Sequence, residues 1–505
     1  MKRFAPVSAA LIALLASSQV LATTYSASGL IDTSGSNPFA ACTADDVAGQ
    51  IEMFGSTLYP NAEVEPWLDV NPTNSQNMIG AYQQDRWNDG ASRGDIAAVT
   101  TDGGATWVHR TLPGTTQCAG GPFPRGTDPW VSFGPTGIAW YVTQTVDFAT
   151  GATGMVVNKS TDGGLTWGQG VNVSPIVSSP PRFPFDDKVS ITADPGDADN
   201  VYVIWDRGLI PFSFAKEHNE HFRFWGFKQP TMMSRTTDRG QTWSEPRVVY
   251  DPGANNFTLF SQIVVLPDGT LVDMLFEFLT KKNNDGGGKF EGQTTVVRSK
   301  DRGVHWSQPI RIARQVPAFL LDTQTPQRVG EPGQAIAVDR NPTSPGYGNL
   351  YAVWLDGRFS DTTFGDIAFS RSTDGGLTWS DPSRANLTPR GHSAFTPTVA
   401  VAADGTVGVG YYDERNYGGD TDPLGPLTTD LWMSHCHAAC TSTANWSETH
   451  VAGPFDQNQA AVAGGLFLGD YAGLATSGNI FHPYYALAID RATNPSDVFF
   501  ANVGP

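Results

Sequence analysis

Basic residues are scarce in this chain of 505 residues. Only 32 Lys and Arg stand against 50 Asp and Glu, which gives a formal net charge of −18 at pH 7. Binding to nucleic acid depends on a concentrated basic surface, so this balance argues against a nucleic-acid partner. It argues equally against an anionic membrane surface. An acidic ligand would need a local cluster of Arg side chains, because the overall field of the protein repels anions.

Long hydrophobic runs are also missing. The apolar run from Ala9 to Leu15 is too short to span a bilayer. It follows the basic start Met1–Arg3 and precedes the small-residue ending Val20–Ala22, a pattern typical of a secretory signal peptide. We therefore expect residues 1–22 to be a signal peptide and the protein to be secreted, extracellular or periplasmic, with no membrane span.

Cysteine is limited to four residues, which suits an exported protein with disulfide bonds. Cys436 and Cys440 are close enough in the chain to close a small loop, which leaves Cys42 to pair with Cys118. Four cysteines allow three pairings, so this one is a preference. Zinc held by Cys436, Cys440 and the histidines that flank Cys436 is the rival interpretation. No metal site or cofactor is predicted, and a structural metal ion is left open.

One eight-residue pattern, in contrast, occurs five times. It reads Ser/Thr-x-Asp-x-Gly-x-Thr/His-Trp and is found at Thr100–Trp107, Ser160–Trp167, Thr236–Trp243, Ser299–Trp306 and Ser372–Trp379. The Asp carboxylate can accept hydrogen bonds from the N–H groups of its own turn, and Gly supplies the positive φ that such a turn needs. The Trp offers a large flat surface for burial against a neighbouring unit.

The spacing of these patterns indicates a repeat architecture. Their tryptophans are 60, 76, 63 and 73 residues apart, which is too long for a solenoid turn and suits a four-stranded blade. The pattern is that of the Asp-box (BNR) repeat, and the chain resembles the sialidase-like β-propeller superfamily over the five boxes and, more loosely, from about residue 61 onward. The resemblance implies that each box is the turn between the third and fourth strands of a blade, opposite the active-site face. We therefore interpret the residues of the boxes as structural and not as catalytic.

The composition, with 54 Gly and 35 Pro and no long amphipathic helical pattern, favours an all-β fold. Seven units each open with two alternating strands around a tight turn, most clearly at Thr396–Tyr412. We therefore predict seven blades, with the six of true sialidases as the alternative. The last unit has only three strands, so we expect an N-terminal arm, residues 23–60, to complete it, and residues 61–505 to form the propeller.

The face opposite the boxes is where we expect chemistry. It collects the loops that enter the first strand of each blade and those that join the second and third strands. These loops contain Asp85–Asn88, Arg125, Gln144, Arg182–Lys188, Asp206–Arg207, Glu277, Lys281, Gln327–Glu331, Asp356–Arg358, His392, Tyr411–Asn416, Asp470–Tyr471 and Asp490–Arg491. An Asp-Arg or Asp-x-Arg pair recurs in five of the units, so we interpret that pair as structural.

The stretch from Arg207 to Gln229 is a long insertion with many aromatic residues. A loop of this length in a compact ring is usually functional. Its aromatic side chains could stack on sugar rings or form a small core of their own. His218 and His221 could bind a metal on a helical turn, but no nearby set of cysteines or carboxylates completes such a site.

Resemblance to sialidases implies three Arg residues that bind a sugar carboxylate, an acidic residue, and a Tyr nucleophile activated by Glu. For the Arg cluster we predict Arg182, Arg328 and either Arg358 or Arg415. The nucleophile is predicted to be Tyr412 or Tyr471. The partner of the nucleophile is predicted to be Glu331 or Glu277. The expected function is a secreted exo-glycosidase, a monomer that acts on an acidic oligosaccharide or polysaccharide.

Two alternatives remain. A uronate-specific polysaccharide lyase on the same propeller would use Arg to neutralise the uronate carboxylate, with His392 or Tyr412 as base and acid. A non-catalytic propeller that binds glycan or protein is the other, since a fold does not fix a function. Elimination leaves a product that absorbs ultraviolet light and hydrolysis does not, so the product distinguishes the two enzymes.

Overall fold

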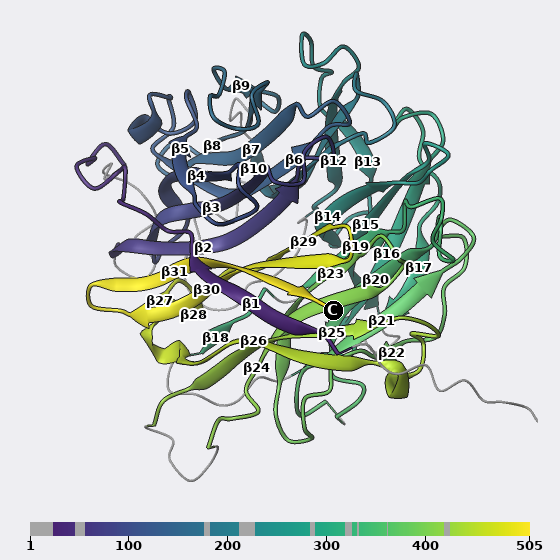
Figure 1. Ribbon diagram of the computed structural model, residues 1–505. Helices are drawn as coiled ribbons and strands as arrows, with labels where there is room; N and C mark the ends of the chain where they lie inside the picture. The colour runs from purple at the N-terminus through teal and green to yellow at the C-terminus, as the bar shows by residue number, and fades with distance from the viewer. Residues whose placement is uncertain are drawn as a thin grey trace, which may run out of the picture.

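The computed structural model describes residues 24–45, 56–175, 182–211, 228–282, 288–318, 326–330, 333–360, 362–418 and 425–505. Its regular structure is almost entirely strand, and the strands form a β-propeller (Figure 1). Short 3₁₀ helices occur at η1 (Gln117–Ala119), η4 (Thr443–Asn445) and η5 (Gln457–Gln459). None of the helices in these described ranges is both long and apolar enough to cross a membrane.

Four sheets are separate four-stranded units in which neighbouring strands are antiparallel. The first contains β10 (Arg182–Ala193), β11 (Val201–Pro211), β12 (Thr231–Thr236) and β13 (Arg247–Tyr250). The second contains β14 (Phe257–Val265), β15 (Leu271–Lys282), β16 (Gly288–Ser299) and β17 (Ile310–Arg314). The third contains β19 (Gln334–Val338), β20 (Leu350–Asp356), β21 (Asp366–Ser372) and β22 (Ser383–Arg384). The fourth contains β23 (Ala394–Val401), β24 (Val407–Asp413), β25 (Thr428–Cys436) and β26 (Ser447–Asp456).

A fifth sheet is continuous over twelve strands. Its members are β1 (Ser26–Asp32), β2 (Leu58–Val70), β3 (Met78–Trp87), β4 (Ser92–Thr100), β5 (Val108–Thr111), β6 (Arg125–Phe133), β7 (Ala139–Asp147), β8 (Ala152–Ser160), β9 (Val171–Asn172), β29 (Gly473–Ser477), β30 (Ile480–Asp490) and β31 (Asn494–Gly504). A small sixth sheet joins β18 (Gln327–Arg328), β28 (Leu466–Phe467) and β27 (Ala461–Val462).

The hydrogen-bonded sheets do not correspond to the seven separate blades predicted from the sequence. Five sheets in the described part of the chain have four or more strands. The difference arises because single residue pairs, Ser92 with Gly126 and Ala62 with Ser496, join neighbouring units into the twelve-stranded sheet.

The first strands of successive units surround one axis. Contacts run in a closed order from β2 to β6, β10, β14, β19, β23 and β29, and from β29 back to β2. The faces between neighbouring units form the apolar core. For example, Val142 and Val157 pack with Val203 and Trp205 of the next unit, and all four are almost fully buried. This packing fixes the inner strands around the axis, where the candidate site lies.

The N-terminal strand β1 pairs antiparallel with the C-terminal strand β31 (Figure 1). Tyr25, just before β1, is buried, and its ring stacks on His435 of β25 with the centroids 4.0 Å apart. The first and last strands of the described chain therefore lie in one sheet.

Each of the five eight-residue boxes closes the turn between the third and fourth strands of its unit. In the first box, Asp102 Oδ1 accepts a hydrogen bond from the Thr106 backbone N–H at 2.9 Å, and Asp102 Oδ2 accepts one from the Thr106 hydroxyl at 2.6 Å. The Thr100 hydroxyl accepts the Gly104 N–H at 3.0 Å, and Gly104 has φ +94°. The ring of Trp107 packs near Phe500 of β31, at a centroid distance of 5.3 Å.

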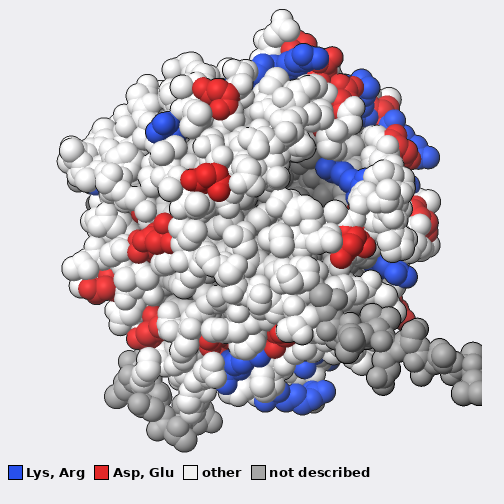
Figure 2. All heavy atoms as spheres, viewed as in Figure 1, with Lys and Arg blue, Asp and Glu red and all other residues white. Residues whose placement is uncertain are grey.

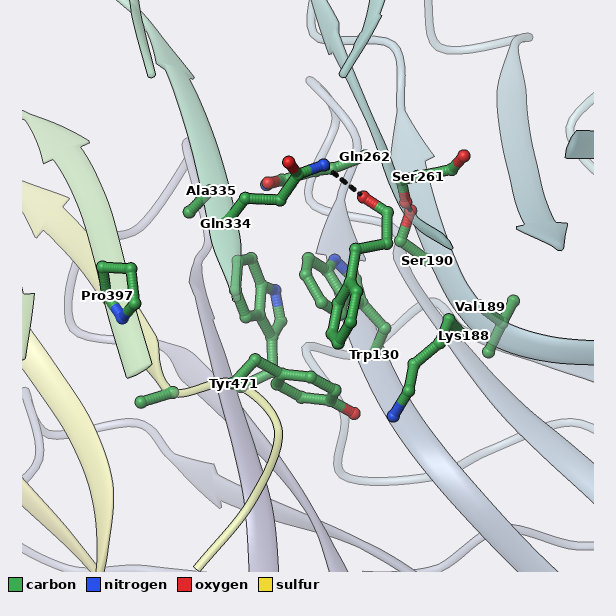
Figure 3. A pocket seen from close by; sticks show the side chains of 13 residues that line it. Trp130, Lys188, Val189, Ser190, Ser261, Gln262, Gln334, Ala335, Pro397 and Tyr471 are labelled. Carbon is green, nitrogen blue, oxygen red and sulfur yellow. Dashed lines mark hydrogen bonds between the residues drawn. The ribbon is translucent and has the colours of Figure 1, made fainter. Parts of the chain in front are cut away.

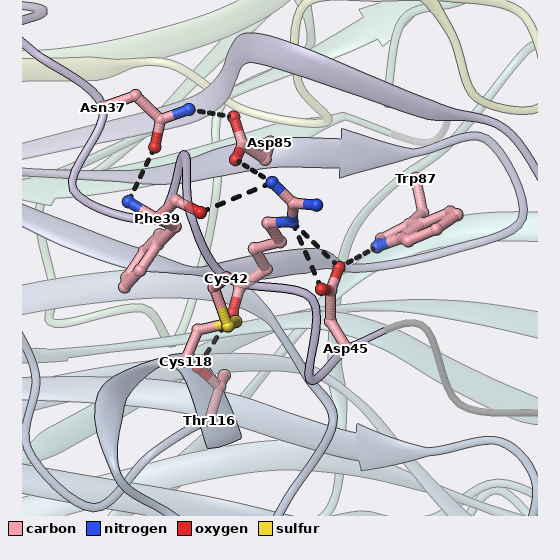
Figure 4. The surroundings of a disulfide bond; sticks show 9 residues. Asn37, Phe39, Cys42, Asp45, Asp85, Trp87, Thr116 and Cys118 are labelled. Carbon is pink, nitrogen blue, oxygen red and sulfur yellow. Dashed lines mark hydrogen bonds and ion pairs between the residues drawn. A yellow bond between two sulfur atoms is a disulfide. The ribbon is translucent and has the colours of Figure 1, made fainter.

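The structure pairs Cys42 with Cys118 and Cys436 with Cys440, which confirms the favoured pairing. Figure 4 shows the first bridge beside Asp45, whose carboxylate accepts the Trp87 indole N–H at 2.7 Å. The bridge thus attaches the N-terminal segment to the first unit. In the view of Figure 2, charged side chains are sparse over most of the surface and gather, with both signs mixed, along one edge.

Candidate functional site

The candidate site begins with a repeated backbone irregularity. The pairing of the first and second strands shifts register at the same place in five units, and one residue at each shift is left-handed. These residues are Glu65 (φ +55°), Asp128 (φ +52°), Lys188 (φ +54°), Phe260 (φ +59°) and Thr396 (φ +49°). Residues other than Gly rarely adopt this conformation, so each bulge stores strain. Its recurrence shows that the bulge belongs to the architecture, whereas the side chain it presents varies.

Three of these bulges bring charged groups together. Lys188 Nζ lies 3.6 Å from Glu65 Oε1 and 3.9 Å from Asp128 Oδ2. It also forms an ion pair with Asp470, which precedes β29. The side chain of Lys188 is 10% exposed and those of its three partners are at most 4% exposed. A single ammonium group therefore joins three buried carboxylates from three different units.

Arg328 completes this group from β18. Its Nε donates to Asp470 Oδ1 at 3.0 Å, its Nη2 contacts the other carboxylate oxygen, and its Nη1 donates to the Ala463 carbonyl at 3.2 Å. The guanidinium lies over the Phe467 ring, 4.2 Å from its centroid, and Arg86 lies 5.0 Å from the same centroid. Its side chain is 32% exposed, which makes Arg328 the cation of this cluster most accessible to a ligand.

The carboxyl groups differ in protonation. Burial raises the pKa of Asp187, the residue before Lys188, to about 6. Burial and the nearby Asp128 carboxylate raise the pKa of Glu65 well above its usual value. For Asp470 burial acts in the same direction, but the charges of Arg328 and Lys188 outweigh it and lower the pKa. The site thus holds an ionised carboxylate beside carboxyl groups that keep their protons to higher pH.

A cavity of about 30 Å³ lies along the residues that follow the bulges. The rings of Trp67 and Trp130 stack there with centroids 3.5 Å apart, and Tyr471 lies 5.2 Å from Trp130 (Figure 3). The Tyr471 hydroxyl donates to the Pro129 carbonyl at 3.0 Å, and burial raises its pKa. A space of this size holds about two water molecules and is too small for a larger ligand.

A larger cavity, of about 340 Å³, lies between the second and third of the separate four-stranded sheets. Its walls are mostly apolar and include Phe257, Leu259, Phe276, Phe278 and Leu355. No charged residue is among the residues that line it. The titratable groups of the described residues therefore lie outside this cavity, and they include Glu277, a predicted partner of the nucleophile, which accepts hydrogen bonds from the Tyr250 and Thr295 hydroxyls.

Of the predicted Arg cluster, Arg328 lies in this site. Arg358 binds both oxygens of Asp356 at 2.8 Å. Arg415 contacts Glu448 at 2.7 Å and lies 3.6 Å from the Trp432 ring centroid. Both guanidinium groups are thus bound by acidic residues close to their own Asp-x-Arg pairs. The backbone of Arg182 pairs with Pro211 at the start of β10, and its side chain is outside the described part of the structure.

The other predicted catalytic residues have separate settings. The Tyr412 hydroxyl donates to the Ala486 carbonyl at 2.8 Å and accepts the Ala486 N–H at 3.1 Å, and the side chain is buried. Burial raises its pKa, which is unfavourable for a nucleophile. His392 is half-buried in the loop before β23. Glu331 and the pair His218 and His221 lie outside the described residues.

The sequence places Asp187, Lys188 and Asp470 in the loops of the expected functional face without assigning them a role, and it does not single out Glu65 or Asp128. Three of the five bulges carry a signal that the sequence does contain. Glu65 and Asp128 each precede Pro-Trp near the opening of a unit, and Thr396 likewise precedes Pro397. A proline disfavours helical conformation in the residue before it. A recurrent polar residue before proline at the start of three units could have located their bulges.

No family model matches the sequence, and no curated protein matches it. Several solved structures are similar to the chain. A Hadza microbial sialidase is 15% identical, with 85% of this chain and 74% of that chain covered and a TM-score of 0.43. A leech intramolecular trans-sialidase is 11% identical, with 88% and 93% covered and a TM-score of 0.43. An ulvan lyase of polysaccharide lyase family PL25 is 13% identical, with 77% and 79% covered and a TM-score of 0.43. These similarities are too distant to bear on activity.

Proposed function

We propose that this protein is a carbohydrate-active enzyme that hydrolyses a glycosidic bond of an acidic glycan at the mouth of the central channel. The observation that supports the proposal is the cluster around Lys188, in which the pKa of Asp470 is lowered and that of Asp187 is raised. Pairs of carboxyl groups whose environments push their pKa values apart are typical of acid–base catalysis.

Glycoside hydrolysis requires a proton donor and an ionised carboxylate on either side of the bond. Asp187 is half-buried, and with a pKa of about 6 it can hold a proton in mildly acidic solution. Glu65 is only 1% exposed and is therefore poorly placed to contact a sugar. Asp187 is accordingly the proposed general acid. Asp470 supplies the negative charge that stabilises a transition state with oxocarbenium character.

Arg328 is the proposed anchor for the carboxylate of the sugar. An Arg side chain has five N–H donors, and in the described part of the chain three of them bind Asp470 and Ala463. The two others can bind a ligand carboxylate, which Arg recognises well because of its planar geometry. This anchoring supports an acidic substrate even though the net charge of the chain is −18.

The test is a screen of the purified protein against sialosides and uronate-containing polysaccharides, read by sugar release and ultraviolet absorbance together. We expect sugar release without absorbance. In Asp187→Asn, kcat should fall by about 10²–10⁴-fold, the usual contribution of a general acid. In Arg328→Ala, KM should rise by about 10–100-fold, and Arg311→Ala on the exposed face of β17 is the control. Absorbance from the wild type would show a lyase, and binding without turnover would show a glycan-binding protein.

We also infer that the ring contains seven repeated units. Seven first strands contact one another in a closed order, and the twelve-stranded sheet divides at the single pairs Ser92–Gly126 and Ala62–Ser496. On this division β1 is the fourth strand of the last unit, which supports residues 23–60 as the arm that completes it. The two disulfides support an oxidising, extracellular location.

A further inference from the structure

Lys188 is held by its backbone as well as by its side chain. Its N–H donates to Asp128 Oδ2 at 3.0 Å and to Asp187 Oδ1 at 3.1 Å. The left-handed conformation at φ +54° presents its side chain at the bulge, where the ammonium meets Asp470. Carboxylates on both sides of the bulge thus fix where the ammonium lies.

The bulge itself does not require a charge. Phe260 occupies the equivalent place in the next unit with φ +59°, and its ring lies 5.2 Å from Lys188 Nζ. Thr396 occupies it in another unit with φ +49°. A neutral side chain is therefore compatible with this backbone conformation. The bulge alone does not explain why Lys188 carries a charge.

The explanation lies in the carboxylates around Lys188. Glu65, Asp128 and Asp470 are all at least 96% buried and come from different units. Burying like charges together is costly unless a cation lies between them. Arg328 also contacts Asp470, but among the described residues no ion pair joins Arg328 to Glu65 or Asp128. Lys188 is thus the group that all three carboxylates share.

We propose that Lys188 is a positioning residue, whose ammonium gathers Glu65, Asp128 and Asp470 at one point on the axis and holds Asp470 in place for the reaction. This inference rests on the proposed function of the same site. Lys188 does not itself act on the substrate in this scheme, because its charge is already shared among the buried carboxylates. Its removal changes the reaction through Asp470.

The charged and titratable groups that face Lys188 come from every neighbouring element. They are Glu65 on β2, Arg86 on β3, Asp128 on β6, Asp187 on β10, Arg328 on β18, and Asp470 and Tyr471 before β29. Removing one positive charge from this set favours the protonated forms of the carboxyl groups. When a carboxyl group loses a neighbouring cation at this distance, its pKa typically rises by about 1–3.

The variants Lys188→Met and Lys188→Arg test this role, with Lys159→Met as the control. Lys159 is bound to the Arg239 carbonyl at the surface, away from the cluster. In Lys188→Met the acid limb of the kcat/KM profile should move to higher pH by about one unit or more. Lys188→Arg, which keeps the charge, should restore most of the wild-type profile. An acid limb that stays in place in Lys188→Met overturns the proposal.

A second measurement keeps the inference separate from the proposed function. Loss of the Lys188 charge destabilises the ionised forms of the carboxyl groups around it and not their protonated forms, so the destabilisation grows as the pH rises. The Tm of Lys188→Met should therefore fall further below the wild type at pH 7.5 than at pH 4.5. This comparison needs no substrate. An inactive wild-type protein would contradict the proposed glycosidase function, but the Tm measurement would still test the role of Lys188. An equal loss of Tm at both pH values overturns the role of Lys188.

Discussion

Lys188 and Asp470 are 282 residues apart in the sequence, and their side chains form an ion pair across the centre of the propeller. Lys188 belongs to β10 and Asp470 precedes β29, so the pair exists only when the ring is closed. The same carboxylate binds Arg328. The integrity of the fold and the charge of the site are therefore linked through Asp470.

Replacing Asp470 with Asn should reduce both stability and activity. The change leaves Lys188 and Arg328 without their shared carboxylate. Loss of one partner from a buried ion pair costs about 3–5 kcal/mol, and we expect about 3 kcal/mol because the Arg328 side chain is 32% exposed. Urea unfolding followed by tryptophan fluorescence measures the effect. Asp381→Asn, at an exposed position, is the control and should change the free energy of unfolding by less than about 0.5 kcal/mol. Equal stabilities of the two variants would contradict this account.

The fold could be predicted from the sequence much further than the site could. The alternation of Val399, Val401, Val407, Val409 and Tyr411 predicted one face around a hairpin. In strands that pair Val401 with Val407, Val401 is half-buried and the other four side chains are buried. Local patterns of this kind set strand faces directly. The disulfide pairing was likewise favoured by chain distance and is confirmed.

The site depends on contacts between units, which no local pattern contains. The predictions placed chemistry in the loops that enter the first strand, among them Arg182–Lys188 and Asp470–Tyr471, and in the loops after the second strand, with roles assigned to Arg358, Arg415 and Tyr412. The structure instead forms its charged cluster from bulges inside the first strands, including Lys188. Tyr412 was named as a nucleophile from the resemblance to sialidases, but its hydroxyl is bound to the backbone of Ala486 in the last unit. Which side chains meet at the axis is decided by ring closure.

Stability should decrease below about pH 4 because the boxes lose their capping carboxylates. Hydrogen bonds from the hydroxyl and the N–H of Thr106 lower the pKa of Asp102 to about 2, and Thr242 has the same effect on Asp238. A group with a lowered pKa in the folded state stabilises it above its unfolded pKa, near 4, and loses this contribution as the pH falls toward 2. Asp102→Asn should make unfolding less sensitive to acid across this range.

Between pH 4 and pH 7 the buried acids act in the opposite direction. Burial raises the pKa of Asp69 to about 6 and those of Asp206 and Glu414 to about 7. The folded state therefore binds more protons here than the unfolded state, and stability falls as the pH rises. His435 and His482, whose pKa values burial lowers to about 4, oppose this trend. Because the acids outnumber them, Tm measured by calorimetry should be highest near pH 4–5. A maximum above pH 7 would contradict this balance.

The two disulfides should differ in their contribution to stability. The residues of the first bridge are 76 apart in the sequence and those of the second are 4 apart. From loop entropy alone, removing the first should cost about 4.5 kcal/mol and removing the second about 2 kcal/mol. Unfolding of Cys42→Ser/Cys118→Ser and of Cys436→Ser/Cys440→Ser in urea measures both. A larger loss for the second pair would mean that local packing, and not chain entropy, dominates.

The proposed closure of the ring by the N-terminal strand predicts a sharp contrast between two residues of the same segment. Tyr25 is 6% exposed and stacks on His435, whereas Leu30 on β1 is 55% exposed. Tyr25→Ala removes a buried aromatic ring from the contact between the first and last parts of the chain, and should cost about 3 kcal/mol. Leu30→Ala should stay within about 0.5 kcal/mol of the wild type. Limited proteolysis provides the second readout, because a released β1 leaves β31 as an exposed edge. If both variants unfold at the same urea concentration and resist the protease equally, then β1 pairs with β31 but does not close the ring.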